Sequence, residues 1–366
     1  MIKDRGQKKL AARYCAVQGL VPFVEVIVRS FASFEDTPVN ITDIDVLGVE
    51  IGHFGRTRRI LFDCKTAYKQ SGINRVLWAS GLRHLVGAEA GFVIQPKKVP
   101  DTHRLAASTM GINIHTEEGF RRYAASLGAD FSKEATYLDE MDQWDELLVA
   151  GRANPAIADL VFFVTTQAAL ELSGPKGVRL GLSILRRTAG ELDPGQRPHQ
   201  MIVGCALSAF LLHMAMSISV LKDVFEFGMT RSDFEQRLRY FLWEGRENYD
   251  LRLKLRRALS KVAGGGDDNP NDFDLPEWAR LIELVRGYLD APEALSKLPL
   301  LIKEIAFRNA ARALKPDADH RIAGLFSASN RARQFIFATM AYLVQATRLP
   351  RAFQQDLEAT TNSLIG

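Results

Sequence analysis

Cysteine is scarce in this chain, and the placement of its few cysteines excludes two classes of protein. Only three of the 366 residues are cysteine, namely Cys15, Cys64 and Cys205. They are far apart and odd in number, with no Cys-x-x-Cys pair and no neighbouring histidines at zinc-binding spacing. These features exclude a disulfide-stapled secreted domain and a zinc-finger site, and we expect a reducing, cytoplasmic location.

The sequence also lacks the apolar N-terminal segment of a signal peptide and the glycine-lysine motif of a phosphate-binding loop. One apolar run, "MIVGCALSAFLLHMAMSISV" at residues 201–220, is about as long as a bilayer span. It contains His213 and three serines and continues into the charged segment "LKDVFEFG". We therefore predict a buried core helix here, with a membrane-anchoring helix as the alternative.

Positive charge is concentrated in one part of the chain. Residues 1–128 contain 18 Lys and Arg against 12 Asp and Glu, whereas residues 129–366 contain 29 against 31. An excess of positive charge confined to one region is typical of a domain that binds a polyanion.

The first 128 residues alternate between helical and strand patterns, which predicts an α/β domain. Three consecutive strands followed by alternating helices and strands indicate a mixed central sheet flanked by helices on both faces. A glycine-bearing hairpin loop, "GHFGRT", separates the second and third strands. The predicted elements are a helix at 4–20, strands at 23–31, 39–52 and 58–66, a helix at 72–87, a strand at 90–96, a helix at 101–111, a strand at 112–116 and a helix at 117–128.

From residue 129 onward the pattern stays helical, which predicts an all-α domain over residues 129–366. Helix starts are marked by residues that cap N-termini. A flexible linker is predicted near 264–273, where the chain reads "GGGDDNPND". The predicted caps are Asp101, Asn154 followed by Pro155, Ser232 with Glu235, and Asp274.

The stretch "RRILFDCKT" is an apolar strand that contains an acid and a base. Strand alternation places Asp63 and Lys65 on one face, while Asp43 and Asp45 share a face of the preceding strand. A hairpin between the two strands brings a carboxylate from each close to the other. Two close carboxylates repel each other unless a cation holds them, and Mg²⁺ or Mn²⁺ suits such a pair.

This arrangement predicts metal-assisted hydrolysis of a phosphodiester. Lysine beside the metal orients or deprotonates the attacking water, or offsets the charge that grows on phosphorus oxygens. The alternative is an ordinary ion pair at a strand end, because an acid-x-lysine triplet arises by chance about once in a chain with this charged fraction.

The segments "TDIDVLGV" and "ILFDCKT", with the helix-strand-helix-strand pattern after them, resemble the PD-(D/E)XK nuclease superfamily. This is the restriction-endonuclease-like fold, and the similarity is closest to its Mrr-like branch. The resemblance covers residues 1–128. It implies that Asp45, Asp63 and the Cys64 backbone carbonyl bind the metal, and that Lys65 is the catalytic lysine.

Further candidates surround this motif. Many members of the superfamily add an acidic residue from the first helix; here Gln7 occupies a comparable place, and Glu25 of the first strand is the substitute. Gln70 and Lys69 follow the motif at the mouth of the site, where they could touch the scissile strand. The arginines before the catalytic strand are candidate phosphate clamps, with a solvated surface as the alternative. They are Arg56, Arg58 and Arg59.

The seven histidines show no metal-ligand spacing, and we interpret His84, His103 and His115 as structural or surface residues.

The sequence therefore favours a Mg²⁺- or Mn²⁺-dependent endonuclease with DNA preferred over RNA, in restriction or anti-phage defence. The helical domain would select target or partner, and a homo-oligomer is expected. The alternative is a non-catalytic subunit that binds nucleic acid or serves in assembly, built on a nuclease fold.

Overall fold

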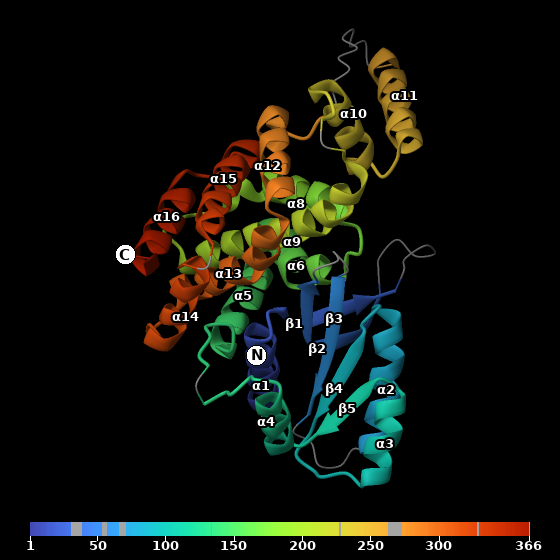
Figure 1. Ribbon diagram of the computed structural model, residues 1–366, viewed down its shortest axis with the longest axis vertical. Helices are drawn as coiled ribbons and strands as arrows, with labels where there is room; N and C mark the ends of the chain where they lie inside the picture. The colour runs from blue at the N-terminus through green and yellow to red at the C-terminus, as the bar shows by residue number, and fades with distance from the viewer. Residues whose placement is uncertain are drawn as a thin grey trace.

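A computed structural model of the protein describes residues 1–30, 39–52, 57–65, 71–132, 134–226, 228–262, 273–327 and 329–365. The chain forms a five-stranded sheet with flanking helices, followed by a helical region that lies against it (Figure 1). Residues 53–56 of the predicted hairpin loop and residues 264–272 of the predicted linker lie outside the described residues.

The α/β region has the predicted order of elements. Apolar alternation forms its strands, and apolar spacing of three and four residues forms its helices. The elements are α1 (Arg5–Val17), β1 (Val21–Arg29), β2 (Asn40–Ile51), β3 (Thr57–Cys64), α2 (Gly72–Leu85), β4 (Ala90–Ile94), α3 (Asp101–Thr109), β5 (Ile112–His115) and α4 (Glu117–Ser126).

The sheet is mixed, as predicted, with strand order β1-β2-β3-β4-β5. The first three strands pair antiparallel, and β3, β4 and β5 pair parallel. Helices α1 and α4 contact each other on one face, and α2 and α3 contact each other on the other (Figure 1). Rings of Tyr14, Phe62, Phe92 and Phe120 pack between α1, α4 and the sheet, with Phe62 and Phe92 stacked at 5.2 Å.

Register places the two predicted aspartates at the same level of the sheet. Val46 of β2 is paired with Phe62 of β3, so Asp45 and Asp63 occupy the next positions along their strands. Because opposite residues of an antiparallel pair share a face, this register brings the two carboxylates together.

The remainder of the described chain contains helices and no strand after β5. These elements are α5 (Met141–Ala153), α6 (Pro155–Phe162), the π-helix η1 (Phe163–Gln167), α7 (Ala168–Leu170), α8 (Gly174–Thr188), the 3₁₀ turn η2 (Ala189–Glu191), α9 (Arg197–Val224), α10 (Arg231–Leu242), α11 (Arg246–Val262), α12 (Trp278–Asp290), α13 (Pro292–Ala310), α14 (Pro316–Ser327), α15 (Asn330–Thr347) and α16 (Ala352–Ile365).

Helix α9 contains the apolar run 201–220 and forms the centre of the helical region. It is long and apolar enough to cross a bilayer, but 94% of its most apolar stretch is buried inside the protein. A Cβ on Gly204 would lie 2.5 Å from the Cβ of Ala306, so glycine lets α9 approach α13 closely. The burial fits the predicted core helix.

Helix starts were predicted with mixed success. Asn154 caps α6 as predicted, since its side chain accepts a hydrogen bond from the Ala156 amide. Helix α10 is capped by Thr230 instead of Ser232, because α10 begins two residues earlier, at Arg231. The cap positions of α3 and α12 are Pro100 and Glu277, one residue before Asp101 and three residues after Asp274.

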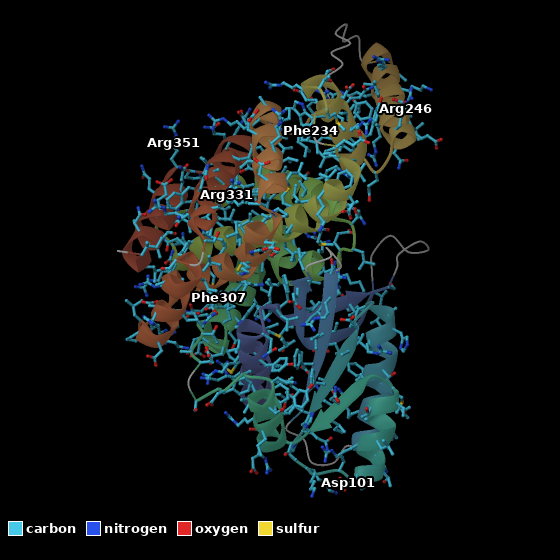
Figure 2. All side chains as sticks on the ribbon, in the orientation of Figure 1. Asp101, Phe234, Arg246, Phe307, Arg331 and Arg351 are labelled. Atoms are coloured by element: carbon cyan, nitrogen blue, oxygen red, sulfur yellow. The ribbon has the colours of Figure 1, made fainter. Side chains whose placement is uncertain are left out.

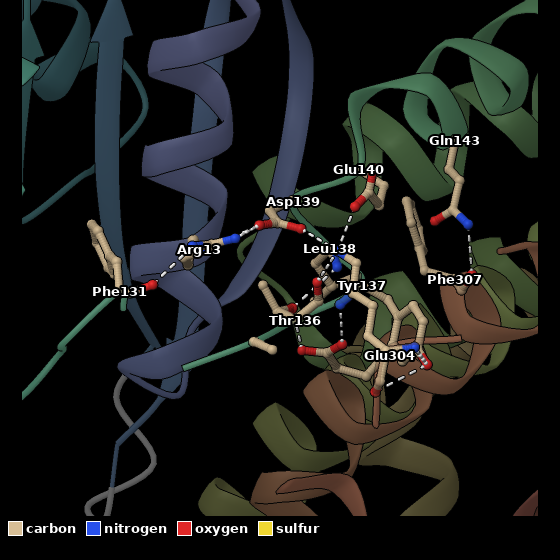
Figure 3. A network of polar contacts seen from close by, with 12 residues as sticks. Arg13, Phe131, Thr136, Tyr137, Leu138, Asp139, Glu140, Gln143, Glu304 and Phe307 are labelled. Atoms are coloured by element: carbon tan, nitrogen blue, oxygen red, sulfur yellow. Dashed lines mark hydrogen bonds and ion pairs between the residues drawn. The ribbon is translucent and has the colours of Figure 1, made fainter. Parts of the chain in front are cut away.

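Buried ionic contacts join the two regions, as Figure 3 shows. Arg13 of α1 donates to Asp139 at 2.8 Å and to the Phe131 carbonyl at 3.0 Å. Glu304 of α13 is fully buried and accepts from the Tyr137 amide at 3.0 Å. The segment between α4 and α5 is therefore bonded to both regions. Figure 2 shows Asp101 at one end of the molecule and Arg246 of α11 near the opposite end.

Candidate active site

The candidate site lies where parallel strands β3, β4 and β5 end. The Lys65 amide donates to the Ile94 carbonyl, and the Gln95 amide donates to the His115 carbonyl, each at 3.0 Å. Helices α1 and α2 begin at the same edge of the sheet. Helix α1 runs from this edge toward the start of β1, and α2 runs from the end of β3 toward the start of β4. Carboxyl ends of parallel strands are the usual place for ligands in α/β sheets.

Asp45 is the centre of the site and is only 4% exposed. One carboxylate oxygen accepts from the Cys64 amide at 2.7 Å and from Lys65 Nζ at 3.4 Å. The other oxygen contacts Lys8 Nζ at 2.8 Å. Asp45 and Lys65 are therefore in contact, and Lys65 keeps 28% of its side chain exposed.

Asp63 lies beside them but is held by a residue that was not predicted. It is 1% exposed and accepts a two-pronged contact from Arg75 of α2, whose Nε lies 2.8 Å from Oδ2. The Arg75 guanidinium also lies 4.4 Å above the Trp78 ring. Burial raises the pKa of Asp63, and the contact with Arg75 only partly opposes this rise.

Lys8 of α1 is the second unpredicted cation, and it bridges two carboxylates. Its buried ammonium contacts both Asp45 and Glu25. Burial alone would lower the pKa of Lys8, but the charges of Asp45 and Glu25 outweigh it and raise that pKa above its ordinary value. The two carboxylates therefore favour the charged form of Lys8.

Glu25 adopts an unusual backbone conformation inside β1. Its φ of 58° is left-handed, although the neighbouring residues Val24 and Val26 are paired regularly with β2. A non-glycine residue in this region costs about 1–3 kcal/mol and is typical of functional sites. Burial raises the pKa of Glu25, despite its contact with Lys8.

Gln7 does not join the aspartates. It is buried in α1, and its Nε2 donates to Glu117 of α4 at 2.7 Å, while its Oε1 has no hydrogen-bond partner within the described part of the chain. Gln7 therefore links α1 to α4 beside the site.

Of the described arginine candidates, one lies at the protein surface and one lies between the sheet and the helical region. Arg58 is partly exposed and pairs with Glu50 at 2.6 Å, so it remains accessible. Arg59 is 3% exposed and donates to the carbonyls of Ala169 and Glu171, each at 2.9 Å. Arg59 thus joins β3 to the helical region and is not available to a phosphate. Arg56, Lys69 and Gln70 lie outside the described residues.

The oxygen donors at the two aspartates are of the chemical type that binds a hard divalent cation. Two carboxylates at one place, together with a backbone carbonyl at Cys64, are the number and type of donors that Mg²⁺ uses with waters and phosphate oxygens. The Lys8 ammonium already bridges Asp45 and Glu25 at this place and balances part of their charge. Among the described residues no cluster of three or more His, Cys, Asp or Glu is placed to hold a metal. Because Arg75 already contacts Asp63, a metal ion would compete with Arg75 for that carboxylate.

Comparison of the chain with known proteins gives no match among protein-family models, curated proteins or solved structures.

Proposed function

We propose that the α/β region is a metal-dependent nuclease that hydrolyses phosphodiester bonds of nucleic acid, with DNA favoured. The observation that carries this proposal is the convergence of three residues at the end of β3. Asp63 lies near the end of that strand and Lys65 follows it, and Asp45 of the antiparallel neighbour β2 lies beside both. All three were expected from the motif, and the register of β2 and β3 supports the role assigned to them. A restriction-endonuclease-like identity for the fold belongs to the same proposal, as does a role in restriction or anti-phage defence.

Asp45, Asp63 and the Cys64 carbonyl would hold Mg²⁺ or Mn²⁺. Bound there, the metal would lower the pKa of a water and polarise a phosphate oxygen. Lys65 is the most exposed member of the cluster, and its ammonium would donate to a nonbridging oxygen of the scissile phosphate. Asp45 orients that ammonium through its contact at 3.4 Å. Arg75 would leave Asp63 and contact a substrate phosphate, since guanidinium binds both anions with the same two-pronged geometry.

The test is cleavage of plasmid, single-stranded DNA and RNA in Mg²⁺ or Mn²⁺ by the wild type, Asp63→Ala and Lys65→Ala. Loss of a group that acts on the transition state costs on the order of 10²–10³-fold in rate. Lys9→Ala is the matched control, because Lys9 lies on α1 but is exposed. If the wild type cleaves none of the three substrates, or if both variants cleave at the wild-type rate, the proposal fails.

A second candidate function is a non-catalytic subunit that binds nucleic acid. The contacts of Lys8 with Asp45 and of Arg75 with Asp63 favour it, because these cations already neutralise the carboxylates. This candidate predicts nucleic-acid binding by the wild type without cleavage, and binding that does not depend on added Mg²⁺.

A further inference from the structure

A cleft of about 670 Å³ opens between α4 and the loop after β4, outside the candidate triad. Clefts of this size hold small ligands. Its floor is the end of β5, and its wall is the first two turns of α4. The residues that line it include Lys98, Arg104, His115, Thr116, Arg122 and Tyr123.

The cleft adjoins the candidate active site along the edge of the sheet. Lys65, Ile94 and His115 lie on three neighbouring parallel strands, joined by the backbone bonds described above. Two strand spacings separate the first from the third, which corresponds to roughly 10 Å between backbones. Gln7 and Glu117 connect α1 with α4 on the same side. A strand of nucleic acid held at Lys65 would therefore reach the cleft within one or two nucleotides.

Two arginines that line the cleft form only exposed ion pairs within the protein. Arg122 contacts Glu118 at 3.2 Å and Arg104 contacts Asp101 at 3.5 Å, and all four side chains are at least half exposed. Exposed pairs of this kind contribute little and are screened by salt. Both guanidinium groups can therefore turn to an anionic ligand at small cost, and Lys98 adds a third positive charge.

The same cleft contains flat rings and an unused polar atom. The His115 and Tyr123 rings lie 5.0 Å apart, and His115 stacks on Phe92 at 6.2 Å. The Nε2 atom of His115 is buried and has no hydrogen-bond partner among the residues that the structure describes. Burial and the nearby Arg104 lower the pKa of His115 to about 4, so the ring is neutral near pH 7. A neutral imidazole can donate to or accept from the edge of a base.

We propose that this cleft binds one nucleotide of a nucleic-acid strand, next to the phosphate held at Lys65. Arg104 and Arg122 contact its phosphate, and the Tyr123 ring, packed against the His115 ring, stacks on its base. This inference rests on the proposed function and assigns a role to His115 that its isolated position in the sequence did not indicate.

The experiment measures binding of a fluorescein-labelled 12-nucleotide single-stranded DNA by anisotropy. The full chain carries Lys65→Ala throughout, so that cleavage does not interfere. In this background Arg104→Gln with Arg122→Gln is expected to weaken binding about tenfold or more and to lower the slope of log Kd against log salt by about 2. Tyr123→Leu should weaken binding about fivefold or more, since base stacking on an aromatic ring is lost.

The matched control is Arg121→Gln, because Arg121 is an exposed neighbour on α4 that does not line the cleft. It should change the affinity less than twofold. Arg122→Lys should restore part of the affinity lost in Arg122→Gln, which a folding defect would not allow. Equal loss in the control and the cleft variants, or no loss in the cleft variants, would overturn the proposal.

Two further titrations test whether the cleft prefers a nucleic-acid strand to a free nucleotide or a free phosphate compound. Deoxyadenosine monophosphate and pyrophosphate are titrated separately against the same variants. Binding of either as tight as that of the oligonucleotide overturns the assignment to a strand. If the wild type cleaves nothing but the cleft variants lose DNA binding, the nuclease proposal fails while the nucleotide subsite stands. If the wild type cleaves and the cleft variants bind normally, only the subsite fails.

Discussion

Lys8 and Lys303 are both buried lysines, one in the α/β region and one in the helical region, and their surroundings are opposite. Lys8 lies between Asp45 and Glu25, which keep it charged. Lys303 is 1% exposed, and its ammonium lies 3.6 Å above the Phe23 ring and 5.1 Å from the Trp144 ring. Burial lowers the pKa of Lys303 to about 8.

The different surroundings of the two lysines distinguish a candidate binding site from a packed core. A cluster of buried charges of both signs persists only if each charge has a partner, and such clusters are typical of places where ions or phosphates bind. Lys303 of α13 instead lies against β1 and α5, where its ammonium contacts the ring faces of Phe23 and Trp144. We therefore interpret Lys8 as part of the candidate site and Lys303 as part of the packing between the regions.

The largest effect is expected for Lys8→Met. This change leaves Asp45 and Glu25 buried without their shared cation, and the cost should be about 3–5 kcal/mol of unfolding free energy. Urea denaturation measures it, with Lys9→Met as the control. Added Mg²⁺ should stabilise Lys8→Met more than the wild type, because the ion replaces the ammonium. Equal stability of Lys8→Met and wild type would contradict the role of Lys8.

The opposite sign is expected for Lys303→Met. Burial disfavours the charged ammonium of Lys303. An uncharged methionine at this position should therefore raise the unfolding free energy by about 1–2 kcal/mol. Between pH 8 and the ordinary value of 10.5 the unfolded chain binds a proton at Lys303 that the folded chain does not. Wild-type stability from this group therefore rises with pH over that window. The advantage of methionine should be greatest below pH 8 and shrink toward pH 10.5, and a pH-independent difference would contradict it.

A smaller effect is expected for Arg75→Gln. Without the guanidinium, a metal ion no longer has to displace a charged hydrogen-bond pair from Asp63. Affinity for Mg²⁺ should therefore rise roughly tenfold in the absence of nucleic acid. Isothermal titration calorimetry measures this directly, with Arg121→Gln as the control. Weaker Mg²⁺ binding in Arg75→Gln would mean that Arg75 supports the ion instead of competing with it.

The smallest effect is expected for Arg58→Ala. Its pair with Glu50 is partly exposed, so the unfolding free energy should change by no more than about 0.5 kcal/mol. If Arg58 contacts a phosphate, the slope of log Kd for DNA against log salt should fall by about 1. An unchanged slope would remove Arg58 from the nucleic-acid surface.

Much of the α/β region could be predicted because its signals are local. Alternation in β2 and β3, glycines between elements and the spacing of apolar residues in α1 identify the elements and their order. Helix caps were predicted less well where several polar residues are close together. Asp274 was expected to cap a helix, but it accepts two hydrogen bonds from Arg239 instead. The contact with Arg239 therefore outweighed the preference of aspartate for a helix N-terminus.

The sequence by itself determined the order of elements and the presence of Asp45, Asp63 and Lys65 on adjoining strands. Both follow from periodicity and from the hairpin between β2 and β3. Only the tertiary structure decided that Lys8 and Arg75 hold these aspartates and that Arg59 is buried against the helical region. It also decided that Glu25 is left-handed and that His115 borders a cleft. These outcomes depend on which helix face meets which strand end, and contacts between residues distant in the chain leave no pattern in a single sequence.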